Sequence, residues 1–183
     1  MKTKKITAQT VALTGIFGAT ALVLSFFEKF MLAALPLPPG VKPGLSNIAV
    51  LFTLQTMGLP CALCIAVIKA GFSLLISGVS TAALSFCGGI ASILTMYILV
   101  RIKKKGLSYT GISVLSAVVH NLGQLIAASA IIGSSVYKAY LPVLILSGII
   151  FGAVTGIILN HVQPALEKFS NKLFSTHSRT ERG

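Results

Sequence analysis

One long apolar stretch of this chain is almost free of charge. Between Pro43 and Val100 the one charged side chain is that of Lys69. Hydrophobic residues make up 55% of the whole chain, charged residues make up 10%, and the mean hydropathy is +0.92. Soluble domains carry about 25% charged residues. The composition therefore excludes a soluble domain and predicts an all-α integral membrane protein.

The apolar runs and the breaks between them predict six membrane-spanning helices. A hydrocarbon core about 30 Å thick needs about 20 apolar residues per helix, and a chain of this length holds about six. Proline, glycine and basic residues separate the runs, because proline lacks the N–H that continues a helix. The predicted helices cover about residues 6–27, 46–57, 61–77, 81–100, 107–132 and 142–162. Residues 1–163 form the predicted transmembrane domain, and residues 164–183 form a basic polar tail.

Basic residues gather on one side of this predicted bundle. With six crossings, that side receives Lys2, Lys4, Lys5, Arg101, Lys103, Lys104, Lys105, Lys168, Lys172, Arg179 and Arg182, and the other receives Lys29, Lys42 and Lys138. An excess of basic residues near span ends marks the cytoplasmic side, so both termini are predicted to be cytoplasmic. The net charge of +12 then fits contact with anionic lipids in the bilayer. No basic stretch alternates with aromatic residues, and no nucleic-acid partner is predicted.

Lys69 is a candidate functional residue because a charge inside a membrane costs several kcal/mol unless it is paired. The chain contains no Asp, and its three Glu residues lie outside the predicted helices: Glu28, Glu167 and Glu181. We therefore expect Lys69 to meet a ligand that carries negative or carbonyl oxygens. The alternative is a structural role in which Lys69 caps neighbouring carbonyls.

Further polar side chains lie on predicted spans. Ser116, His120 and Gln124 follow one another at i, i+4 and i+8, which places them on one helix face. Lipid cannot satisfy such groups, so the face must point into the bundle or a cavity. The alternative is that these side chains, and Gln55 in particular, bridge helices. The predicted substrate-binding residues are Lys42, Asn47, Lys69, His120, Asn121 and Gln124.

Signatures of catalysis and of metal binding are weak in this sequence. There is no phosphate-binding loop of the G-x-x-x-x-G-K-[ST] type and no Asp-rich motif for magnesium. Cys61 and Cys64 form a single CxxC pair, and the one other cysteine is Cys87, so we interpret all three as small buried apolar residues. We predict a binding protein rather than an enzyme, without a metal or another cofactor.

Small residues recur at helical spacing in the first and the last span. Such stripes let another helix approach closely. For the last span, packing within the chain's own bundle is the preferred interpretation. For the first span we favour docking of an external membrane partner. The stripes consist of Ala8, Ala12, Gly15 and Ala19 in the first span and of Gly148, Gly152 and Gly156 in the last.

Three segments carry a family resemblance: residues 39–47, Ser85-Phe86-Cys87-Gly88-Gly89, and His120-Asn121-Leu122-Gly123-Gln124. They resemble the small bacterial membrane family called Gx transporter, over nearly all of residues 6–162. That family also carries the label heptaprenyl diphosphate synthase component I, and it resembles the substrate-binding S components of energy-coupling factor (ECF) transporters. The resemblance implies six helices with both ends inside, a long outer loop, and an Ala-xxx-Ala patch, here Ala8 and Ala12.

The resemblance implies a multi-pass protein of the bacterial plasma membrane that takes up a small molecule. An S component captures its substrate from outside and delivers it through a transmembrane partner and two ATPases. The proline-rich segment 35–44 would be its lid, and the substrate would be small and anionic or amphipathic. The alternative is a noncatalytic membrane subunit for heptaprenyl diphosphate synthesis, in isoprenoid or quinone metabolism. A stand-alone channel or facilitator is a third hypothesis.

Overall fold

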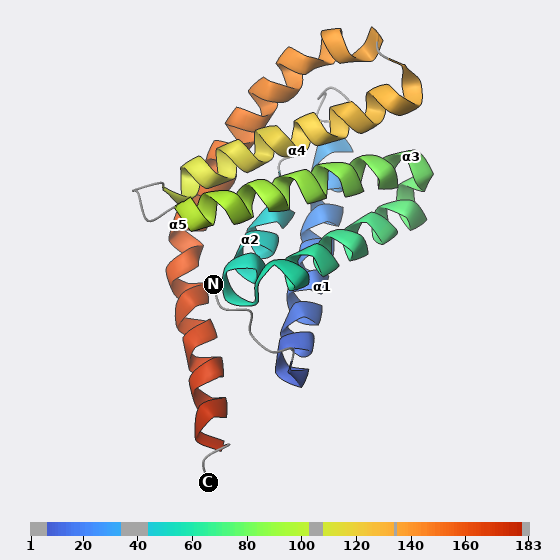
Figure 1. Cartoon of the computed structure of the whole chain (residues 1–183). Coiled ribbons are helices and arrows are strands. Elements are labelled where there is room, and N and C mark those ends of the chain that lie inside the picture. The colour runs from blue at the N-terminus through green and yellow to red at the C-terminus, as the bar shows by residue number, and fades with distance from the viewer. Residues whose placement is uncertain (1–6, 34–43, 103–107, 134, 181–183) are drawn as a thin grey trace.

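The computed structural model describes residues 7–33, 44–102, 108–133 and 135–180, and within these ranges it is entirely α-helical (Figure 1). The prediction of an all-α protein is therefore confirmed. The five helices in these ranges are α1 (Ala8–Ala33), α2 (Ser46–Thr56), α3 (Leu59–Ile102), α4 (Tyr109–Ile132) and α5 (Ser135–Thr180).

Four of these described helices, α1, α3, α4 and α5, are long and apolar enough to cross a membrane. The chain is therefore a multi-pass membrane protein. The remaining helix, α2, has 11 residues. At 1.5 Å per residue it is about 16 Å long, roughly half the thickness of a hydrocarbon core. The six predicted helices thus correspond to five observed ones, of which α2 is too short to span by itself.

The third and fourth predicted helices are joined in α3, which has 44 residues and turns sharply at Gly78. Gly78 has φ 84° and ψ 177°, a conformation that glycine adopts without the steric penalty of a side chain. Figure 1 shows the two arms of α3 lying side by side after this turn. The break predicted at residues 78–80 is therefore confirmed.

The short helix α2 forms the centre of the bundle. Seven of its residues are buried: Ser46, Ala49, Val50, Leu51, Phe52, Thr53 and Leu54. They pack into one core with residues of α1, α3, α4 and α5, among them Ala21, Ile65, Ile93, Ile112 and Leu159. Phe52 also contacts Phe17 of α1 with the two rings tilted at 56° and 4.8 Å between their centroids. Because the other helices enclose α2, the polar residues of its first turn lie inside the bundle, where they can form part of a binding site.

Helices α4 and α5 pack closely along the predicted glycine stripe. A Cβ atom on Gly148, Gly152 or Gly156 would lie 3.0, 2.7 or 2.6 Å from a Cα atom of α4. This confirms packing of the last stripe within the chain's own bundle. Helix α5 begins before Pro142 and continues as far as Thr180, so it is longer at both ends than the predicted sixth span, and most of the predicted tail is helical.

The small residues of the first stripe face outward. Ala8, Ala12, Gly15 and Ala19 are all exposed on α1, and a Cβ atom on Gly15 would meet nothing within 4 Å. Large apolar side chains are exposed on the same helix, including Val11, Ile16 and Val23. In a membrane protein such a surface contacts either lipid or another membrane-embedded chain.

Candidate functional site

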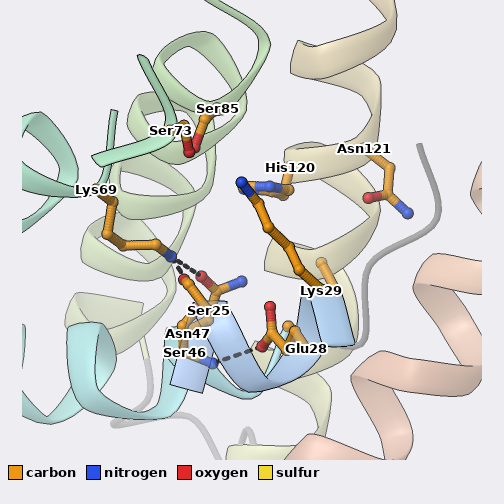
Figure 2. A pocket seen from close by; sticks show the side chains of 12 residues that line it. Ser25, Glu28, Lys29, Ser46, Asn47, Lys69, Ser73, Ser85, His120 and Asn121 are labelled. Atoms are coloured by element: carbon orange, nitrogen blue, oxygen red, sulfur yellow. Dashed lines mark hydrogen bonds between the residues drawn. The ribbon is translucent and has the colours of Figure 1, made fainter. Parts of the chain in front are cut away.

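Residues from α1, α2, α3 and α4 line a cavity of about 40 Å³, which we call the charged pocket (Figure 2). Most of the side chains that line it are polar, although the helices that carry them are apolar. Such a cluster inside an apolar bundle is a candidate binding site. Its described residues are Ser25, Glu28, Lys29, Gly44, Ser46, Asn47, Lys69, Ser73, Ser85, Ala117, His120 and Asn121.

Lys69 reaches from the first arm of α3 to the first turn of α2. Its Nζ donates to Ser46 Oγ at 2.8 Å and, more weakly, to Asn47 Oδ1 at 3.5 Å (Figure 2). The side chain is partly buried. Lys69 therefore has partners within the chain, so the structural role left open by the sequence is at least part of its function.

Glu28 is the second charge of the pocket, and the sequence-based prediction about it was wrong. It was expected outside the helices, but α1 continues to Ala33 and leaves Glu28 only 4% exposed. Its Oε1 accepts the backbone N–H of Ser46 at 2.8 Å, and its negative charge attracts the Lys69 ammonium. A carboxylate at this place stabilises the N-terminus of α2 through the helix dipole. The chain thus does hold a carboxylate buried in the helix bundle near Lys69.

Lys29 is the third charge, and it too was expected outside the helices, near the outer loop. The structure instead places it on the wall of the charged pocket, where its Nζ donates to Ser77 Oγ at 2.7 Å. This bond links α1 to the end of the first arm of α3, next to the turn at Gly78. Two lysines and one glutamate line the pocket, and this leaves one positive charge in excess when His120 is neutral.

Four of the six predicted binding residues line the charged pocket: Asn47, Lys69, His120 and Asn121. Gln124 does not line it but supports His120 from one turn away, since Gln124 Nε2 lies 3.0 Å from His120 Nε2. Lys42 lies outside the described residues.

Asn121 belongs mainly to the helix interface. Its Nδ2 donates to Leu144 O at 2.8 Å and to Ser147 Oγ at 3.3 Å, and both acceptors are on α5. In Figure 2 its side chain points away from Lys69. The bridging alternative is therefore confirmed for Asn121. It is confirmed for Gln55 as well, whose Oε1 accepts from Gln163 Nε2 across α2 and α5.

Glu28, Lys29 and Ser46 are among the pocket residues that sequence reasoning missed. A signal was present, because Ser25, Glu28 and Lys29 follow at i, i+3 and i+4 and so share one face of a helix. Glu28 and Lys29 directly follow the apolar run 6–27, so they were interpreted as the charged residues that commonly flank a membrane-spanning helix. Their helical spacing to Ser25 would have indicated that the three side chains share a polar helix face, and that this face points into the bundle.

The structure corrects the interpretation of the cysteines. Cys64 and Cys87 are exposed on the outside of the bundle and Cys61 is partly buried, all as free thiols. The expectation that all three are buried is therefore wrong for Cys64 and Cys87. Among the residues that the structure describes, no three His, Cys, Asp or Glu side chains lie close enough together to hold a metal ion.

These features define the class of this protein: a multi-pass membrane protein with a charged pocket enclosed by apolar helices. The family model for heptaprenyl diphosphate synthase component I matches residues 17–162. The chain belongs to that family. No curated protein and no solved structure matches it.

Proposed function

We propose that this chain is a noncatalytic, membrane-embedded binding subunit whose charged pocket holds the anionic group of a small molecule. The observation that carries the proposal is the meeting of Lys29 and Lys69 with a single carboxylate, Glu28, in one cavity. Lys69 is partly buried and the bond of Lys29 to Ser77 is exposed, so the pocket presents an excess positive charge that attracts an anionic ligand. Ser46, Ser73 and Ser85 offer hydroxyl groups that can donate to such an anion.

The size of the cavity limits what it holds. A volume of about 40 Å³ suits an anionic group or a few water molecules, whereas sites for whole drug-sized ligands measure about 300 to 1,000 Å³. The pocket would therefore bind the charged end of a larger ligand, and the rest of that ligand would need the helices to separate or would lie outside the pocket.

The family description supports a role beside prenyl diphosphate synthesis, because a prenyl diphosphate carries such an anionic end. We propose a noncatalytic role there, since prenyl transfer depends on magnesium ions that carboxylate oxygens hold. Among the side chains that the structure describes, Glu28 is the one buried carboxylate, and it already accepts the N–H of Ser46. Catalysis would then belong to a separate, carboxylate-rich partner.

A second candidate is uptake of a small molecule in the manner of an ECF S component, energised by partner ATPases. It is supported by the exposed stripe of Ala8, Ala12, Gly15 and Ala19 on α1, which would dock a transmembrane partner. Under this uptake hypothesis both termini are cytoplasmic, and the charged pocket receives its ligand from the outer side of the membrane. The lid expected at residues 35–44 falls largely outside the described residues.

Lys69→Met should reduce retention of the native ligand by about tenfold or more. Removal of the ammonium leaves Lys29 and Glu28 as the two charges of the pocket, so the excess positive charge that attracts an anion is lost. The measurement is native mass spectrometry of the small molecules that copurify with the wild-type protein and with the variant. We expect the wild-type protein to carry an anionic ligand and the variant to carry at most about a tenth as much, since the loss of a charge-assisted hydrogen bond of about 1.5 to 3 kcal/mol weakens binding tenfold or more.

Lys168→Met is the matched control, because Lys168 is exposed on α5 and lies far along the chain from the charged pocket. It should retain the ligand fully. Lys29→Met tests the pocket a second time without breaking the bonds of Lys69 to α2, and it should also reduce retention. Equal ligand content in all four proteins would refute the pocket as the binding site.

Ala12→Leu distinguishes the two proposed assemblies. A leucine on the exposed stripe of α1 blocks close helix packing but leaves the charged pocket untouched. If the chain acts in uptake, affinity purification from its native membrane should recover a transmembrane partner and ATPases with the wild-type chain and lose them with Ala12→Leu. Recovery of a soluble, Asp-rich prenyl transferase with both proteins would instead support the isoprenoid assembly. Val11→Leu, on the same exposed surface but off the stripe, is the control.

A further inference from the structure

A second, smaller cavity lies behind the charged pocket, between α2 and the two arms of α3. Its volume is about 10 Å³, which is room for about one water-sized or methyl-sized group. Three polar residues, Asn47, Lys69 and Ser85, line both cavities and form their common boundary. The residues that line the inner cavity alone are apolar or lack a side chain: Val50, Ala66, Gly89 and Ile93.

Gly89 keeps this inner cavity open. A Cβ atom there would meet a single neighbour, Ala66 Cβ, at 3.7 Å, which is an ordinary contact, and the backbone of Gly89 is helical. Neither packing nor backbone conformation requires glycine at this position. The adjacent Gly88 is different, because its Cβ would lie 2.7 Å from Gln124 Cγ and 2.8 Å from His120 O. Gly88 allows α3 and α4 to meet, whereas the effect of Gly89 is to leave a space.

We propose that the inner cavity is an apolar subsite of the charged pocket, and that the ligand is a small anion bearing a methyl-sized apolar group. This inference rests on the proposed function, since the anionic end must first lie beside Lys69. The apolar group would pass the polar boundary and contact Val50, Ala66 and Ile93, all of which are at most 3% exposed. A bulky substituent would exceed the volume of this cavity, and a polar one would face the apolar side chains of Val50, Ala66 and Ile93.

The test uses two probes that share one charged group: inorganic phosphate and isobutyl phosphate. Each is titrated calorimetrically into the purified full-length protein in lipid nanodiscs. Burial of one methyl group strengthens binding about fourfold, so isobutyl phosphate should bind about fourfold more tightly than phosphate. Gly89→Ala fills the inner cavity and should remove this preference while it leaves phosphate affinity unchanged. Gly15→Ala makes the same change on the outer face of α1 and should retain the preference.

Ile93→Val enlarges the inner cavity by one methyl group. This variant should still prefer isobutyl phosphate over phosphate, and a loss of the preference would count against the subsite. Thermal unfolding midpoints of all variants verify that they are folded. If Gly89→Ala binds both probes as the wild-type protein does, the apolar subsite is refuted and the anion site stands. If a water molecule fills the inner cavity instead, isobutyl phosphate shows no advantage in any protein, which also overturns the inference. If neither probe binds, or if Lys69→Met binds both unchanged, the proposed function itself fails.

Discussion

Glu28→Ala should lower the free energy of unfolding by about 3 kcal/mol, the cost of breaking a buried charge pair by removing one partner. The change removes the acceptor of the Ser46 N–H and the negative charge that attracts Lys69. It leaves the first turn of α2 without its cap at the centre of the bundle. The thermal unfolding midpoint in detergent, followed by size-exclusion fluorescence, should fall by many degrees.

A double-mutant cycle separates the cap from the charge. Glu28→Gln keeps an oxygen that can accept from Ser46 and should cost clearly less than Glu28→Ala. Glu28→Gln combined with Lys69→Met removes both charges. The double variant should be more stable than the sum of the two single effects predicts, because each single change leaves an unpaired charge behind and the double change leaves none. Strictly additive effects would show that Glu28 and Lys69 do not interact. A wild-type midpoint for Glu28→Ala would contradict the burial of this carboxylate.

The helices could be predicted where local signals mark their ends. Helix α2 was expected at about residues 46–57 and is found at Ser46–Thr56, because glycines and a proline flank it. Helix α4 begins at Tyr109, where the Ser108 hydroxyl accepts the N–H of Gly111, close to the expected start. The turn inside α3 followed from Gly78. Each of these features depends on a few residues that are neighbours in the sequence, so it could be predicted from the sequence alone.

The charged pocket could be predicted only in part, because it depends on where a helix ends in three dimensions. Lys69 and His120 lie in the middle of apolar runs, where a polar side chain is unusual and so marks a candidate site. Glu28 and Lys29 stand at the end of such a run, where charge is expected anyway. Only the continuation of α1 to Ala33 and the docking of α2 against it bring these two charges inside.

The role of each polar residue was harder to predict than its inward direction. His120 and Asn121 are adjacent in the sequence, but a step of one residue rotates the side chain about 100° around the helix. Asn121 therefore meets Leu144 and Ser147 of α5, while His120 lines the charged pocket together with Lys69. Helical spacing predicts on which face of a helix a residue lies. Which other helix packs against that face depends on the three-dimensional packing of the bundle.

Gly156→Ala should destabilise the protein by about 2 to 3 kcal/mol, the upper range for overpacking a close contact. The added Cβ atom would lie 2.6 Å from the Cα atom of Thr110 and 3.2 Å from Ser113 Cβ. A backbone atom cannot turn aside as a flexible side chain can, so α4 and α5 must separate. Separation also weakens two hydrogen bonds between these helices, Ser113 to Thr155 and Asn160 to Thr110, both at 2.8 Å.

Gly15→Ala is the matched control for this change, because its Cβ atom meets nothing within 4 Å. In a helix, alanine is favoured over glycine by up to about 1 kcal/mol, so Gly15→Ala should leave the unfolding midpoint unchanged or raise it. Gly156→Ala has the same intrinsic preference and should nevertheless lower the midpoint, which makes the difference between the two variants a measure of the contact between α4 and α5. Equal midpoints would show that the two helices do not approach each other this closely at Thr110.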